Sequence, residues 1–170
     1  MEMPFDQITV SSLSRRCEIS PNTFYYHYQD IHDLLDYWLR TKMDQELALF
    51  PESLPWNERV RRILTLCKEN ERLIFHISDS NARAHLERYV FETSKAYVLD
   101  AVDERLGKAS ISDVRRHEMA SFLQFVFLGF FIRFLWNKMQ NDIDASVEWL
   151  DQQFCFYVRK AASDTYRPRS

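Results

Sequence analysis

Apolar residues recur at spacings of three and four along most of this chain, and this spacing places side chains on one face of an α-helix. The longest regular series falls between positions 34 and 50, directly before Pro51. It predicts one long amphipathic helix over residues 31–50, with Arg40 and Lys42 on its solvent side. The chain has only two Gly and five Pro, which is too few turn formers for many short strands. We therefore predict an all-α fold.

Two short helices joined by a tight turn are predicted within residues 8–35. Thr9 suits the N-cap of the first helix, because its hydroxyl can accept a hydrogen bond from a backbone N–H of the first turn. Ser20 and Pro21 suit the N-cap and the first position of the second helix. Asp30 is expected to cap the long helix that follows.

The second short helix has two different faces. At 100° per residue, Phe24 and Tyr28 share one face, whereas Asn22 and Tyr26 point the opposite way. A helix-turn-helix presents polar groups in this manner to the major groove of DNA. Asn can hydrogen-bond a base edge, and Thr, Tyr and His side chains can bind phosphates. The alternative is that this aromatic run is simply a packing helix.

Further helices, separated by polar turns, Pro and Gly, are predicted for the rest of the chain. After a connector over residues 51–56, Asn57 is expected to cap the next helix. Asp113 is expected to start the most apolar helix, and Gly107 to end the helix before it. The predicted helices include residues 60–67, 72–78, 86–107, 113–136 and 145–162, and residues 165–170 are expected to be frayed.

Residues 122–136 form the most apolar stretch of the chain, and Gln124, Gly129 and Arg133 interrupt it. A membrane span needs roughly 20 apolar residues without such interruptions, so we expect no membrane insertion. A helix that is apolar all round must be buried on all sides. We expect one side to face the core and another to face an identical chain. The last two helices of each chain would then form a four-helix homodimer interface, where Gly129 lets a second backbone come close.

The charge of the chain is mild, with a net value of −3. Residues 1–40 carry three arginines against six acidic residues. This balance is unusual for a DNA-binding segment, because neutralisation of phosphates supplies most non-specific affinity. Arg15 and Arg16 could nevertheless form a local basic spot.

No secretory signal pattern is found in residues 1–10. Three widely spaced cysteines lie in apolar stripes, namely Cys17, Cys67 and Cys155. We expect them to be reduced core thiols of a cytoplasmic protein rather than a disulfide or a metal site.

Motifs of catalytic or metal sites are not found. A chain with two Gly has no phosphate-binding glycine loop, and none of the five His has a Cys or His partner three or four positions away. We therefore expect no enzyme activity, no cofactor and no metal.

A helical bundle of this kind could enclose an apolar pocket with a few polar groups. Five side chains in the middle of the chain could meet in such an effector site: Arg72, His76, Arg83, His85 and Tyr89. They could equally be surface charges and core histidines. Trp56 and the aromatic residues of positions 122–131 could line the pocket or belong to the core.

The segment ITVSSLSRRCEISPNTFYYHYQDIHDLL, residues 8–35, closely resembles the DNA-binding domain of TetR-family transcriptional regulators. The resemblance implies a helix-turn-helix DNA-binding domain at residues 1–35 and a helical effector-binding and dimerisation domain at residues 36–170. It implies a homodimeric regulator, expected to be a repressor, that binds double-stranded operator DNA and is released by an unknown small-molecule effector. The residues expected to contact DNA are Thr9, Ser11, Asn22, Thr23, Tyr25, Tyr26 and His27.

Three features depart from the pattern of that family. Only seven residues precede Ile8, so the helix that usually comes before the motif is expected to be truncated or absent. Ile31 stands where the family usually has a Lys that touches the DNA backbone, and Glu18 stands in the turn where Gly is frequent. These departures leave open a second interpretation, a dimeric helical binding or adaptor protein that has lost DNA binding.

Overall fold

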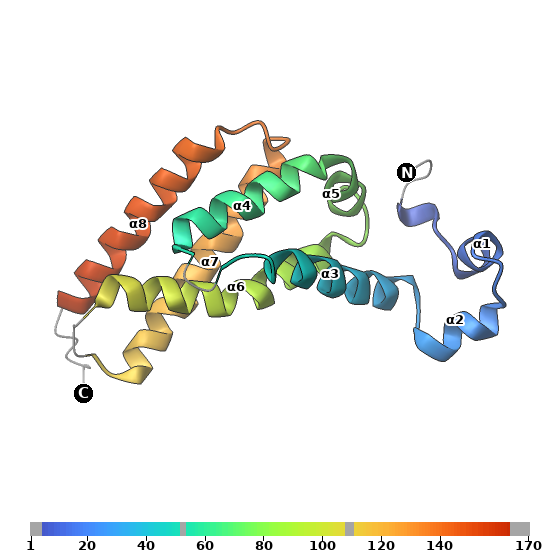
Figure 1. The fold of residues 1–170 in the computed structure, drawn as a ribbon, viewed down its shortest axis with the longest axis horizontal. Helices are drawn as coiled ribbons and strands as arrows, with labels where there is room; N and C mark the ends of the chain where they lie inside the picture. Colours follow the sequence, from blue (N-terminus) through green and yellow to red (C-terminus); the bar gives the residue numbers. More distant parts are fainter. Residues whose placement is uncertain (1–4, 52–53, 108–110, 164–170) are drawn as a thin grey trace. The chain divides into compact units, whose positions relative to one another are not determined.

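A computed structural model describes residues 5–51, 54–107 and 111–163 of the protein. These residues form eight α-helices and one 3-10 helix and contain no strand, which confirms the all-α fold class. In chain order, the elements in Figure 1 are η1 (Phe5–Gln7), α1 (Val10–Arg16), α2 (Pro21–His27), α3 (Ile31–Leu47), α4 (Trp56–Glu69), α5 (Glu71–Ser78), α6 (Arg83–Leu106), α7 (Asp113–Trp136) and α8 (Ile143–Ser163). The C-terminal tail, for which fraying was predicted, lies outside the described residues.

Two compact units make up the chain. The first unit, residues 1–52 and 69–90, contains η1, α1, α2, α3, α5 and the first turns of α6. The second unit, residues 53–68 and 91–170, contains nearly all of α4, the rest of α6, and α7 and α8. The helix-turn-helix segment therefore belongs to the same unit as the turn between α5 and α6.

The helix starts predicted for the first unit are confirmed. The side chain of Thr9 accepts a hydrogen bond from the Ser12 N–H at 3.1 Å, and Ser20 accepts one from the Thr23 N–H at 3.1 Å. Asp30 accepts hydrogen bonds from two backbone N–H groups of the first turn of α3. These caps are local, because donor and acceptor are never more than three residues apart.

Helix α3 ends at Leu47, three residues before the predicted end at Phe50. The Phe50 N–H donates to the Leu47 carbonyl at 3.0 Å, a tighter i to i+3 bond than that of an α-helix. Pro51 disfavours the α conformation for the residue before it, so the chain leaves the helix earlier than the apolar pattern indicates.

The predicted cap at Asn57 is wrong, because α4 already begins at Trp56. Trp56 is buried and stacks on Phe154 of α8, with ring centroids 4.4 Å apart. The guanidinium of Arg105 in α6 lies 5.1 Å from the centroid of the Trp56 ring. The start of α4 is therefore fixed by packing between helices rather than by a side-chain cap.

Helix α7 supplies much of the core of the second unit. Its buried residues are Met119, Ala120, Leu123, Gln124, Phe127, Phe131, Phe134 and Leu135. The α8 residues Val147, Leu150, Phe154 and Val158 are also buried. In length and apolar composition α7 could cross a membrane, but the core helix of a soluble protein passes the same test.

An apolar outer face remains on α7 and α8. Its large exposed side chains are Val114, Phe122, Phe125 and Trp136 of α7 and Trp149 and Phe156 of α8. The prediction that α7 is apolar on more than one side is confirmed, and we refer to these six residues as the outer face. Gly129 is also exposed, and nothing lies within 4 Å of the position that a Cβ atom would take there.

The three cysteines are free, but only Cys67 is fully buried. The expectation of a core thiol is wrong for Cys17, which is exposed, and holds only in part for Cys155. Cys17 follows the last residue of α1 and caps its C-terminus, so its side chain has left the apolar stripe of that helix.

Candidate nucleic-acid interface

The turn of the helix-turn-helix is a Schellman motif at the end of α1. The Ile19 N–H donates to the Ser14 carbonyl at 3.0 Å, and the Glu18 N–H donates to the Arg15 carbonyl. Glu18 has a φ of +54°, the left-handed conformation that favours Gly. The turn therefore keeps its expected geometry although the residue in it is not Gly.

Helix α2 buries one aromatic side chain and exposes the others. Phe24 is 3% exposed, whereas Tyr25 and Tyr26 are 58% and 85% exposed. Tyr28, which follows the helix, lies between these extremes, with its ring centroid 5.6 Å from that of Phe24. The opposite placement of Phe24 and Tyr26 follows the predicted helical periodicity and excludes a helix that packs with all its aromatic residues.

All seven residues predicted to contact DNA are exposed: Thr9, Ser11, Asn22, Thr23, Tyr25, Tyr26 and His27. Five of them lie on α2, where their side chains are exposed to solvent over its two turns. The Tyr26 and His27 rings meet edge to face, with centroids 4.9 Å apart. The Thr9 and Thr23 hydroxyls are engaged at the N-termini of their helices, which holds these two side chains in place.

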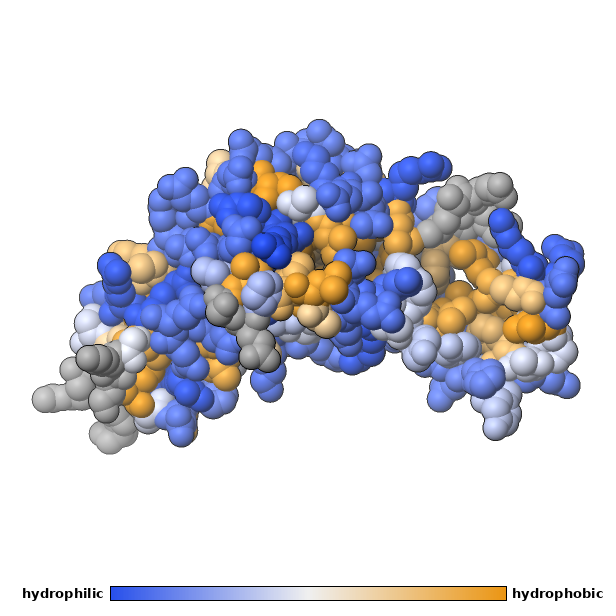
Figure 2. Space-filling view, in the orientation of Figure 1, coloured by the Kyte–Doolittle hydropathy of each residue, from blue (hydrophilic) through white to orange (hydrophobic). Residues whose placement is uncertain are grey.

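Charge around this surface is mixed. Arg15 and Arg16 are exposed at the C-terminal end of α1, and Ile31 is half-buried at the start of α3. Hydrogen bonds from the backbone, chiefly that of Asp33, hold the pKa of Asp30 below its usual range, so this cap is negatively charged near neutral pH. Figure 2 shows apolar atoms on the surface here, and Ile19 is 40% exposed.

Contacts with the turn between α5 and α6 hold the start of α3. The rings of His32 and His85 stack with centroids 4.9 Å apart, and His85 Nδ1 lies 2.8 Å from a carboxylate oxygen of Asp36. His32 Nε2 lies 3.2 Å from the Asn81 side-chain oxygen, and the Asn81 N–H donates to Asp6 at 3.0 Å. The helix-turn-helix is thus fastened to the first turn of α6 by side chains from three segments.

The five residues predicted for an effector site lie on α5 and the first turns of α6. Arg72 is exposed and His76 is half-buried. Arg83 pairs with Glu87 at 2.7 Å, and His85 contacts Asp36 as described above. Tyr89 is buried, and its hydroxyl lies 3.5 Å from the Asp44 carboxylate. Three of the five therefore have partners within the first unit.

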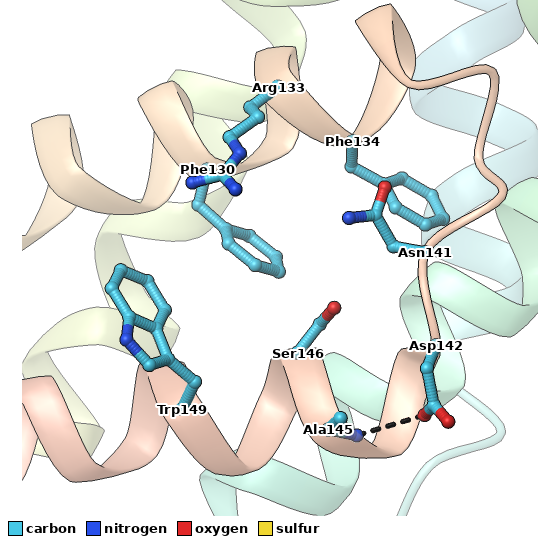
Figure 3. A pocket seen from close by; sticks show the side chains of 8 residues that line it. All are labelled: Phe130, Arg133, Phe134, Asn141, Asp142, Ala145, Ser146 and Trp149. Carbon is cyan, nitrogen blue, oxygen red and sulfur yellow. Dashed lines mark hydrogen bonds between the residues drawn. The ribbon is translucent and has the colours of Figure 1, made fainter.

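A pocket that sequence reasoning missed lies between α7 and α8 in the second unit (Figure 3). Its volume is about 430 Å³, and its lining residues are Phe130, Arg133, Phe134, Asn141, Asp142, Ala145, Ser146 and Trp149. The signal available in the sequence was Phe130 and Phe134 at helical spacing before a polar loop, with Trp149 in the helix after it. A metal site is a different matter, because no group of His, Cys, Asp or Glu side chains in the described part of the chain could hold an ion.

Comparison with known families identifies the second half of the chain. A family model described as the transcriptional regulator C-terminal region matches residues 55–154, more than half of the chain. No curated protein is significantly similar in sequence. The match covers α4 to most of α8 and does not include the helix-turn-helix segment.

Proposed function

Because the chain belongs to the TetR family of transcriptional regulators, we propose that it is a homodimeric, cytoplasmic repressor that binds operator DNA and is released by a small-molecule effector. In this proposal the DNA-binding residues are the seven predicted from the sequence, which lie on α1, its N-cap and α2. Asn22 and Tyr25 read bases, whereas Thr23, Tyr26 and His27 bind phosphates. Members of the family generally bind DNA and effectors as dimers and are not enzymes.

The observation that carries the proposal is the outward surface of α2. Tyr26 is 85% exposed on a helix whose opposite side is anchored by buried Phe24. Its hydroxyl can hydrogen-bond a phosphate, and its ring can contact the adjoining sugar or base. A helix with a buried anchor and an exposed polar-aromatic surface is suited to enter a major groove.

The test is to titrate labelled DNA from upstream of the gene with the protein and to measure binding by fluorescence anisotropy at two salt concentrations. We expect saturable binding that exceeds binding to random DNA and weakens as salt rises. Tyr26→Ala should lower this affinity by at least about tenfold, equivalent to the loss of one good contact. Tyr37→Ala is the matched control, because Tyr37 is 55% exposed on α3 outside the predicted surface.

A second candidate function is a dimeric binding or adaptor protein without DNA-binding activity. Two features favour this alternative: acidic residues outnumber arginines in residues 1–40, and Ile31 stands in place of a Lys. Under this alternative, no specific DNA binding is observed even at low salt, and Tyr26→Ala and Tyr37→Ala behave alike. Normal operator binding by Tyr26→Ala would instead refute the assignment of the recognition residues.

Effector control requires that an effector prefer one of two conformations of the dimer. In the proposal, α3 acts as the lever, because it begins directly after the helix-turn-helix and its first turns contact the α5–α6 turn through His32 and Asp36. Effector contact is assigned to the α5–α6 residues Arg72, His76, Arg83, His85 and Tyr89 by the sequence prediction alone.

A further inference from the structure

We propose that the pocket between α7 and α8 is a binding site for a small aromatic carboxylate. The inference rests on the proposed function only where it makes such a ligand the effector, since binding itself can be measured without DNA. The pocket has about 430 Å³, which lies within the range of roughly 300–1,000 Å³ typical of small-molecule sites.

Aromatic side chains form the walls of this pocket. Phe130 and Phe134 project from α7, and Trp149 projects from the facing side of α8 (Figure 3). Phe134 is buried, whereas Trp149 is half exposed at the rim, where the pocket borders the outer face. Three rings around one cavity favour a planar apolar ligand, because aromatic pairs stack or meet edge to face.

The charge of the pocket favours an anion at one end. Arg133 lies beside Phe130 at the rim, and its guanidinium makes no hydrogen bond or ion pair with any residue in the described part of the chain. A guanidinium that has no carboxylate partner in the protein presents a fork of donors that fits a ligand carboxylate. The partner that this arginine lacks is therefore the group that the ligand would supply.

The side chain of Asn141 indicates that the ligand carries a hydrogen-bond donor. The side-chain oxygen of Asn141 is buried, and among the described residues it has no hydrogen-bond partner. The Ser146 hydroxyl lies across the cavity from it, as Figure 3 shows. A buried acceptor without a partner is costly, so a ligand hydroxyl or amino group opposite the carboxylate would bind more tightly than a plain ring.

The acidic residue of the pocket does not oppose this assignment. A carboxylate oxygen of Asp142 accepts the Ala145 N–H at 3.0 Å, which makes Asp142 the cap of α8. In Figure 3, Asp142 and Arg133 lie on opposite sides of the cavity. The ligand carboxylate would therefore sit at the Arg133 end, and the ring hydroxyl would sit near Asn141.

The experiment is titration of the full-length protein with 4-hydroxybenzoate, benzoate and the neutral 4-hydroxybenzamide, measured by isothermal calorimetry and tryptophan fluorescence. We expect saturable binding of 4-hydroxybenzoate, weaker binding of benzoate, and binding of the amide that is weaker by at least about tenfold. Trp149→Phe should remove most of the fluorescence change while calorimetry still detects binding.

Arg133→Gln is the decisive variant, and Arg159→Gln is its matched control, because Arg159 lies on α8 and does not line the pocket. Both arginines are exposed, so neither substitution endangers the fold. We expect Arg133→Gln alone to weaken binding by at least about tenfold. Equal binding by Arg133→Gln and the native protein, loss of binding in Arg159→Gln alone, or no saturable binding of any probe up to millimolar concentration would each overturn the proposal.

Whether the ligand releases the protein from operator DNA is measured separately from whether the ligand binds. If 4-hydroxybenzoate binds and depends on Arg133, the pocket is a ligand site whatever the protein does with DNA. If the protein binds its operator and the ligand does not bind, the repressor function stands and this pocket is not its effector site. The two failures can therefore be told apart.

Discussion

Glu18 holds a backbone conformation that an L side chain adopts only at a cost. Its φ of +54° is required by the Schellman turn between α1 and α2. A left-handed conformation costs a non-Gly residue about 1–2 kcal/mol, and Gly avoids this cost. Gly also makes the unfolded chain more flexible, which offsets about 0.4–1 kcal/mol of the gain in stability. We expect Glu18→Gly to raise the free energy of unfolding by about 0.5–1 kcal/mol, measured by urea denaturation.

Glu18→Ala separates backbone relief from the loss of a charge. It removes the carboxylate but keeps the Cβ atom in the left-handed conformation, so no comparable gain is expected. A gain as large as that of Glu18→Gly would show that charge, rather than backbone conformation, limits the stability of this turn.

Cys67 should be the least reactive of the three thiols. Burial raises its pKa from 9.0 to about 12, and the thiolate is the reactive form. Iodoacetamide added near pH 8 should therefore label exposed Cys17 and spare Cys67 until the protein is unfolded, as measured by peptide mass spectrometry. Labelling of Cys67 as fast as Cys17 in the folded protein would contradict its burial.

The same pKa shift predicts a loss of stability in alkali. Between about pH 9 and 12 the unfolded chain has released the Cys67 proton and the folded chain still keeps it. Stability then falls as pH rises, because the folded state binds more protons than the unfolded state. The stability advantage of the native protein over Cys67→Ala should accordingly shrink over this range, which urea denaturation at several pH values can measure.

Residues that act through their neighbours in sequence were predictable, and residues that act through distant partners were not. Thr9, Ser20 and Asp30 cap helices as predicted because each contacts a backbone N–H within three residues. Asn57 has the same chemistry but lies inside α4, because packing of Trp56 on Phe154 decides where that helix begins.

At the scale of helices, Arg105 joins three of them in the second unit. Its side chain is only 11% exposed, donates to the Ala101 carbonyl at 2.7 Å, pairs with Asp151 of α8 and lies over Trp56 of α4. Lys keeps the charge but has neither the planar fork nor the stacking surface of Arg. We expect Arg105→Lys to lower the free energy of unfolding by about 1–2 kcal/mol, measured by urea denaturation.

Arg159→Lys is the control for this prediction. Arg159 is exposed on α8, and surface substitutions usually change stability by less than about 0.5 kcal/mol. Equal losses in the two variants would mean that Arg105 contributes no more than a surface charge, contrary to its burial between helices.

Helix boundaries and faces show what periodicity can predict. The outward Tyr26 and inward Phe24 follow from the helical repeat alone, because both lie on one short helix. The pocket residues Asn141 and Ser146 could not be predicted in this way, since their meeting depends on how α7, the loop and α8 pack. A one-dimensional pattern carries no information on that packing.

At the scale of the whole molecule, the outer face of α7 and α8 leaves large apolar groups in water. Phe156 and Phe125 are 71% and 64% exposed, and the face continues along both helices. Contiguous apolar surface of this kind marks a protein interface, and in the proposal a second copy of the chain covers it. The same patch on both partners would give a two-fold symmetric interface.

Phe156→Glu should therefore convert the proposed dimer into a monomer, because pairing would bury an uncompensated charge on each side of the interface. Light scattering should give a mass that falls towards the 20.5 kDa of one chain. Leu49→Glu is the control, since Leu49 is 75% exposed after the end of α3 and belongs to the first unit, whereas the outer face belongs to the second. A Phe156→Glu variant that keeps the native mass, or a Leu49→Glu variant that loses it, would place the dimer interface elsewhere. Because a dimer presents two recognition helices, monomeric Phe156→Glu should also lose operator affinity although its α2 surface is unchanged.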